Sequence, residues 1–212
     1  MMTSTRSRTR FATALLGVVV GLALATAPVR AAGTARDVVA GAMDEILAVL
    51  KDKGTTTQDR MGKIESIAYV HFDFDSMSRF VLAKNYKDLN DQQRKAFEEE
   101  FKKHISLTYG RRVENYSNES IQTGEPREER NKDVTVPTKI MGGQANGVEI
   151  DYRMRQKNGN WQVIDVIIER VSLVSNFRSQ IQEIISSKGT DKLIELLHDK
   201  NAAREAELAK AG

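Results

Sequence analysis

The chain has 212 residues and a formal net charge of +3, from 32 basic and 29 acidic side chains. Four of the basic residues are arginines within residues 1–31, which contain no acid. The rest of the chain therefore holds 28 basic against 29 acidic residues and is nearly neutral, which excludes the basic footprint of a nucleic-acid-binding protein. Cysteine is absent, and this excludes disulfides, thiolate metal sites, cysteine nucleophiles and a lipidated N-terminal cysteine.

The first 31 residues have the pattern of a secretory signal. Arg6, Arg8 and Arg10 precede an uncharged, mostly apolar run over 11–27. That run is short for a membrane span, which needs about 20 apolar residues. We expect cleavage after Ala31, so that residues 1–31 are a removed signal peptide and the mature protein is soluble in the periplasm. The alternative is an uncleaved membrane anchor.

Helical spacing of apolar residues dominates the first half of the mature chain. It predicts helices over 34–53 and from the threonines at 55–57 to residue 71, then a third helix that an aspartate caps. Asn90 and Gln93 have the spacing of a capping box and open a long helix over 90–116. One face of this helix carries a stripe of large side chains: Phe97, Phe101, Ile105, Tyr109 and Val113.

The period of the pattern changes to two near residue 117. Alternation predicts strands over 134–140, 148–154 and 161–171, and a more polar edge strand within 118–129. The Asn158-Gly159 pair predicts a tight hairpin between the last two strands. The helical period then returns and predicts a helix over 173–185 and a last one from Thr190 through Leu197.

Helices and strands that are segregated along the chain predict an α+β fold. We expect a sheet of about four antiparallel strands packed against several helices. The chain has no internal repeat and no linker rich in proline, glycine and serine. We interpret residues 32–200 as a single domain and 201–212 as a flexible polar tail.

Sequence motifs for catalysis or metal binding are weak. The chain has no phosphate-binding P-loop and no Gly-x-Ser-x-Gly elbow. Its histidines, His71, His104 and His198, are scattered, and helix capping explains the Asp73-x-Asp75 pair better than metal binding does. We therefore expect no metal, no cofactor and no enzymatic activity.

Asp165 is the one candidate for a general acid or base. Period two places it on the same side as the apolar residues Trp161, Val163 and Ile167, and a buried carboxylate needs a partner. We favour an arginine such as Arg178, which would join the last strand to the next helix. The alternative is a polar group in a pocket, acting as a catalyst or as an anchor for a ligand.

Several segments, taken together in their order and spacing, resemble the MlaC family, also called the toluene-tolerance auxiliary transport family. The resemblance covers residues 34–200 approximately. The segments that carry it are Phe72-Asp73-Phe74-Asp75-x-Met77, Phe80-Val81-Leu82, Gln92-Gln93-Arg94-x-x-Phe97, Thr108-Tyr109, Val148-x-Ile150-x-Tyr152, Trp161-x-Val163-x-Asp165-Val166, Val171-Ser172-Leu173-Val174-x-Asn176-Phe177-Arg178-x-Gln180 and Leu193-Ile194-x-x-Leu197.

The resemblance implies a twisted antiparallel sheet with an apolar pocket between sheet and helices. It also implies a periplasmic lipid carrier, the substrate-binding component of an ABC-type system that moves phospholipid between the outer and inner membranes. Its partners would be phospholipid, an inner-membrane ABC transporter complex and an outer-membrane complex that donates or accepts lipid. A carrier for another lipid such as a hopanoid, a small pocketed enzyme with Asp165 as base, and a structural adaptor stay open as alternatives.

Successive side chains of a strand alternate between its two faces, and helix residues four positions apart share a face. Each rule places a set of apolar side chains on one surface. The resemblance implies that acyl chains lie between these surfaces. The residues that we expect to contact lipid are Phe80, Val81, Phe97, Phe101, Ile105, Tyr109, Val136, Ile150, Tyr152, Val163, Ile167, Phe177 and Ile181.

Overall fold

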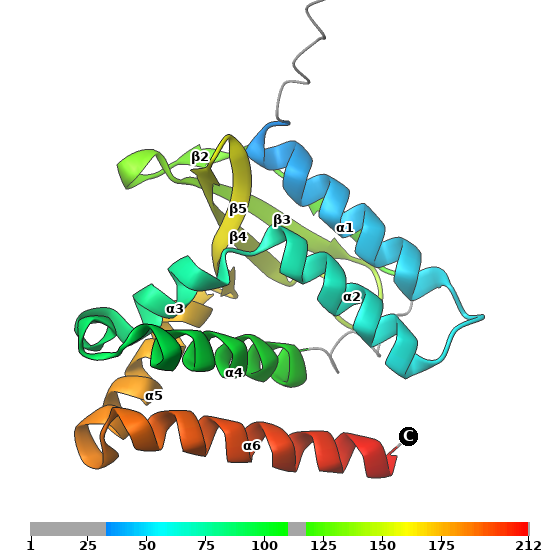
Figure 1. Cartoon of the computed structure of the whole chain (residues 1–212). Coiled ribbons are helices and arrows are strands. Elements are labelled where there is room, and N and C mark those ends of the chain that lie inside the picture. The colour runs from blue at the N-terminus through cyan, green and yellow to red at the C-terminus, as the bar shows by residue number, and fades with distance from the viewer. Residues whose placement is uncertain (1–32, 110–117, 212) are drawn as a thin grey trace, which may run out of the picture. The chain divides into compact units, whose positions relative to one another are not determined.

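The computed structural model describes residues 33–109 and 118–211, which all lie in one compact unit of the chain (Figure 1). Within that unit, helices and an antiparallel sheet pack together in the predicted α+β arrangement. The predicted signal peptide over 1–31 lies outside the described residues, and so does the end of the long predicted helix from residue 110 onward.

Side-chain caps fix where the first helices begin. The Thr34 hydroxyl accepts a hydrogen bond from the Asp37 N–H (3.2 Å), and the Asp37 carboxylate accepts one from the Thr34 N–H (2.9 Å). Asp73 accepts from the Ser76 N–H (3.1 Å), which confirms the predicted aspartate cap. These elements are α1 (Ala35–Lys51), α2 (Thr57–His71), α3 (Phe74–Leu82) and a 3-10 turn, η1 (Ala83–Asp88).

The other described helices are α4 (Asp91–Tyr109), α5 (Leu173–Lys188) and α6 (Thr190–Ala211), with a second 3-10 turn, η3 (Arg130–Lys132). The predicted capping box is confirmed, because Asn90 and Gln93 exchange two hydrogen bonds of 2.9 Å. Helix α6 is longer than predicted and includes nearly all of the residues interpreted as a tail. It continues there because Asn201, which is 1% exposed, is buried against α4 and hydrogen-bonds to Glu100.

The sheet has the order β1-β3-β4-β5-β6, with β2 also paired to β3, and every pairing is antiparallel. The predicted last strand is divided in two, because Glu169 and Arg170 adopt positive φ angles of 48° and 68° and turn the chain. The described strands are β1 (Ser120–Thr123), β2 (Arg127–Glu128), β3 (Val134–Met141), β4 (Glu149–Lys157), β5 (Asn160–Ile168) and β6 (Val171–Ser172).

A β-bulge at Ile164 changes which side chains of β5 face the core. Val163 pairs with Met154, but Asp165 pairs with Arg153, so one extra residue of β5 stands opposite this step of β4. Directly paired residues share a face of the sheet. Side chains before and after the bulge therefore change sides relative to simple alternation.

Most helices touch the sheet directly, but two of them pack mainly on other helices. Helix α1 packs on β1 and β3, and α2, α3 and α5 pack on β5. Helix α4 packs on α3 and α6, and α6 also packs on α5. In Figure 1, α4 and α6 lie side by side and run in the same direction. The predicted aromatic stripe of α4 therefore meets helices where strands were expected.

Candidate functional site

The candidate lipid-contacting side chains gather in one hydrophobic cluster that joins the sheet to the helices. Twelve of the thirteen predicted residues belong to it. Eight of them are buried: Val81, Phe97, Phe101, Val136, Tyr152, Val163, Phe177 and Ile181. Four are partly buried: Phe80, Ile105, Tyr109 and Ile150.

Ile167 is the exception, and the bulge explains it. Tyr152 pairs with Val166 and Ile150 pairs with Ile168, so Val166 and Ile168 lie on the core face. Ile167 and Asp165 consequently lie on the opposite face from Tyr152. The predicted alternation placed Asp165 and Ile167 on the same face as Val163, and this does not hold beyond the bulge.

On the helical side, aromatic rings form the centre of the cluster. Phe97 and Phe101 of α4 are completely buried and stack with ring centroids 5.6 Å apart. Phe101 and Phe177 of α5 pack edge to face, with ring centroids 5.4 Å apart. His104 and Phe177 pack in the same way, with centroids 5.5 Å apart. Such ring pairs stabilise a core by about 0.5–1.5 kcal/mol beyond the area that they bury.

On the sheet side, Tyr152 places a hydroxyl group inside the cluster. Its hydroxyl contacts the Met43 thioether of α1 at 3.5 Å, and a thioether is only a weak acceptor. Burial raises the pKa of Tyr152 to about 12, so the side chain is neutral at physiological pH. Tyr152 therefore contributes an uncharged surface to the cluster.

Asp165 has a different partner from the one predicted. One carboxylate oxygen accepts from the Ser172 hydroxyl (2.6 Å) and the other from the Val174 N–H (3.1 Å), at the beginning of α5. Arg178 instead donates to the carbonyl oxygen of Phe80 (2.6 Å). Both oxygens of Asp165 thus serve the start of a helix, which is where a carboxylate stabilises exposed backbone N–H groups.

A buried ion pair, which the sequence pattern gave no reason to expect, lies beside α3. Asp133 is completely buried and accepts two hydrogen bonds from Arg155 (2.7 and 2.8 Å), with Arg153 3.3 Å away. The Arg155 guanidinium also lies over the Phe80 ring, 5.3 Å from its centroid. At the end of the same strand, Lys157 binds Asp73 at 3.0 Å. These contacts fix β4 against the elements around it.

A second polar network joins α4 to α6. The Asn201 amide nitrogen donates to the carbonyl and the carboxylate of Glu100 (both 2.8 Å). Its oxygen therefore faces His104 Nδ1 at 2.9 Å and accepts a hydrogen bond from the N–H there. His198 Nδ1 lies 2.7 Å from the other Glu100 oxygen. Burial lowers the pKa of His104, whereas the hydrogen bond to Glu100 raises that of His198.

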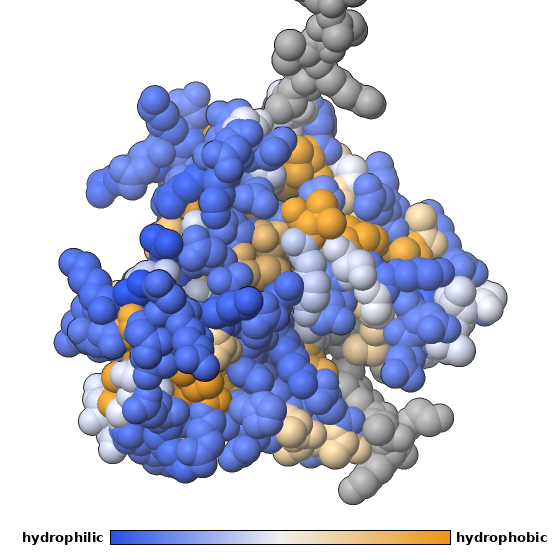
Figure 2. All heavy atoms as spheres, in the orientation of Figure 1, coloured by the Kyte–Doolittle hydropathy of each residue, from blue (hydrophilic) through white to orange (hydrophobic). Residues whose placement is uncertain are grey.

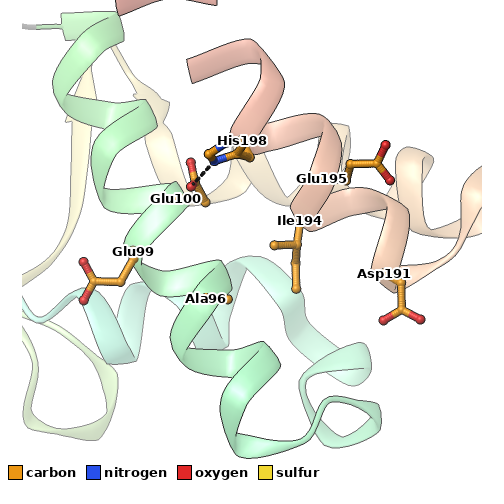
Figure 3. A pocket seen from close by; sticks show the side chains of 7 residues that line it. All are labelled: Ala96, Glu99, Glu100, Asp191, Ile194, Glu195 and His198. Carbon is orange, nitrogen blue, oxygen red and sulfur yellow. Dashed lines mark hydrogen bonds and ion pairs between the residues drawn. The ribbon is translucent and has the colours of Figure 1, made fainter. Parts of the chain in front are cut away.

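An open groove of about 470 Å³ lies along the seam between α4 and α6 (Figure 3). Its lining comes from both helices: Ala96, Glu99, Glu100, Asp191, Ile194, Glu195 and His198. In Figure 2 a small hydrophobic patch between hydrophilic surroundings is visible at this seam. Acidic borders of this kind make the groove a poor site for acyl chains, which bind in dry, apolar cavities.

The described residues form neither a metal-binding cluster nor a helix that could cross a membrane. Within 33–109 and 118–211, no group of three or more His, Asp or Glu side chains is arranged to hold a metal ion. No helix in the same ranges is both long and apolar enough to cross a membrane.

Comparison with known proteins agrees with these features. Residues 40–199 match the family model described as MlaC protein. The chain is 25% identical over 166 residues to the "Toluene tolerance protein ttg2D" of Pseudomonas putida, with 76% of this chain and 77% of that protein covered. It is 29% identical over 134 residues to the "Intermembrane phospholipid transport system binding protein MlaC" of Haemophilus influenzae, with 60% and 61% covered.

The fold also has a solved counterpart. The phospholipid-binding protein from Ralstonia solanacearum, determined in complex with a phospholipid, superposes with a TM-score of 0.74 at 22% identity. The match covers 82% of this chain and 99% of that one, so the two share a fold. Because the family model spans most of the unit that the structure describes, the chain belongs to the MlaC family.

Proposed function

We propose that this protein is a soluble periplasmic lipid carrier that binds phospholipid and catalyses no reaction. Within that proposal it is the substrate-binding component of an ABC-type system that moves phospholipid between the outer and inner membranes. Family membership supports this function, since the Haemophilus relative is named as the binding protein of an intermembrane phospholipid transport system. The basic and apolar pattern of residues 1–31 supports export.

The observation that carries the proposal is the hydrophobic cluster between sheet and helices. Acyl chains would lie along β4 and β5, next to Ile150, Tyr152 and Val163, and reach the aromatic rings of Phe101 and Phe177. Methionines contribute to the same core, among them the completely buried Met77 and Met154. Because methionine is unbranched and flexible, such a core can re-pack around chains of different length.

The energetics of transfer favour an adaptable site over a tight one. Each methylene removed from water is worth about 0.8 kcal/mol, so the chains of one phospholipid far exceed any usable affinity measured from water. A carrier exchanges lipid between a bilayer and its own interior, and both are apolar. The exchange is therefore close to neutral, and its direction must come from the inner-membrane transporter complex and the outer-membrane complex.

Asp165 supports a role without catalysis. A general base needs an oxygen within hydrogen-bond reach of a substrate proton. Both Asp165 oxygens are instead engaged at the start of α5, and the residue lies on the opposite face of the sheet from Tyr152. We interpret it as a structural carboxylate.

The proposal is tested with delipidated protein and liposomes that contain a fluorescent phospholipid. After incubation the protein is separated from the liposomes, and the label bound per protein molecule is counted. We expect about one phospholipid per chain, retained through gel filtration and released by organic solvent. Protein that emerges without label while a known phospholipid carrier becomes loaded would contradict the proposal, and so would release of lysophospholipid or free fatty acid.

A further inference from the structure

The groove between α4 and α6 is a feature to which lipid carriage gives no role. Its floor is apolar: in Figure 3 the Ile194 side chain reaches into the space between the two helices, with Ala96 facing it across the seam. Its borders are acidic, with Glu99 on α4 and Glu195 on α6. Figure 3 shows these carboxylates pointing away from the seam, one outward from α4 and the other outward from α6.

The acidic borders are only lightly neutralised. Glu195 pairs with Lys192 of its own helix, an exposed contact of a kind that contributes about 0–1 kcal/mol. Asp191 accepts a hydrogen bond from the neutral amide of Gln93. Glu99 has no ion pair among the described residues. A cation brought by another molecule could therefore bind at these borders without breaking a strong contact.

The size of the groove limits what can occupy it. Its lining on α6 runs from Asp191 to His198, which is roughly 10 Å at 1.5 Å per residue, or two helical turns. Ala96 is small and leaves room for one entering side chain between the helices. A helix that lies along the seam would place a single apolar residue on Ala96 and Ile194. Its neighbours three or four positions away would reach the acidic borders.

We propose that this groove docks a basic helical segment of a protein partner, in which one apolar side chain is flanked by lysine or arginine residues. Negative borders repel an anionic bilayer surface and attract a cationic segment, so charge complementarity favours protein over membrane. The inference rests on the proposed function, because a carrier must dock on the complexes that supply and receive its lipid. The groove is separate from the residues assigned to the acyl chains, so substitutions at its borders should leave lipid binding intact.

The test uses two variants with the same change of charge. Glu99→Lys with Glu195→Lys reverses the groove borders, and Asp44→Lys with Glu45→Lys makes the same change on an exposed part of α1. Each protein is sedimented with inner-membrane and outer-membrane vesicles prepared from the bacterium that makes it, and with liposomes of the extracted lipids. Bound label per protein is measured separately with a fluorescent phospholipid. Glu99→Gln with Glu195→Gln is a milder variant that avoids introducing new positive charge.

We expect the groove reversal to reduce binding to at least one type of native vesicle tenfold or more, with the α1 variant within twofold of wild type. The glutamine pair should show a smaller loss, and all variants should keep their lipid and their melting temperature. Equal binding by the groove and α1 variants would overturn the inference. The inference would also be overturned if the groove reversal reduced binding to protein-free liposomes as much as binding to native vesicles, since the groove would then contact lipid. Absence of bound phospholipid in wild type would refute the carrier function separately, because sedimentation does not require cargo.

Discussion

Replacing Asp165 by asparagine tests whether this residue is structural. The carboxylate accepts two hydrogen bonds at the start of α5, from the Ser172 hydroxyl and the Val174 N–H, and it is 8% exposed. Asparagine keeps one acceptor oxygen but loses the charge. The change from charged to neutral bonding removes about 1 kcal/mol, and the lost interaction with the helix N-terminus about another 1 kcal/mol. We expect a loss of about 2 kcal/mol in the free energy of unfolding.

For a domain of this size, 1 kcal/mol lowers the melting temperature by about 2–4 °C, so Asp165→Asn should melt about 4–8 °C below wild type. The matched control is Asp151→Asn, which removes a carboxylate from the neighbouring strand. That residue forms a surface ion pair with Arg127, whose side chain is 57% exposed, and the control should melt within about 2 °C of wild type. Thermal unfolding followed by circular dichroism measures both. An Asp165→Asn variant that melts like the control would refute the structural role. A phospholipid hydrolysis that wild type performs and the variant lacks would show catalysis instead.

Four further predictions rest on other contacts of the protein. Val163→Trp should abolish most phospholipid loading, whereas Ile167→Trp should leave it within twofold, because the bulge places the two side chains on opposite faces; equal loading would contradict this assignment. Asp133→Asn should cost about 1.5–2 kcal/mol in urea unfolding, because Arg153 and Arg155 lose a charged partner but stay 38% and 35% exposed, and a loss under about 0.5 kcal/mol would contradict it. Burial lowers the pKa of His104, so stability that is present above pH 6.5 is lost as the pH falls, and His104→Gln should reduce that loss. The raised pKa of His198 has the opposite sign: it adds stability below pH 6.5 that disappears as the pH rises, and His198→Gln should remove only that part.

The main elements could be predicted from the sequence because their signals are local. Helix starts such as Asn90 with Gln93 are specified by side chains three residues apart, and the hairpin at Asn158-Gly159 by adjacent residues. Periodicity also identified most side chains of the core, since one face of each element is apolar. Twelve of the thirteen candidate residues are in that core for this reason.

The differences arise where a distant partner decides the structure. Alternation cannot reveal a bulge, because Ile164 is as apolar as its neighbours, and the faces of Asp165 and Ile167 were predicted incorrectly as a result. The length of α6 depends on Asn201, a polar residue that is buried only because Glu100 and His104 of α4 receive it. The pairing of Asp133 with Arg155 likewise joins residues 22 positions apart, and no local pattern specifies it.

Native mass spectrometry of the protein isolated from the periplasm tests the carrier function most directly. The spectrum gives the mass of the intact chain and of anything that stays bound to it. We expect a species heavier than the mature polypeptide by the mass of one phospholipid, which collisional activation releases as an intact lipid. A spectrum that contains only the bare polypeptide, from protein whose organic extract also lacks lipid, would contradict the proposed function.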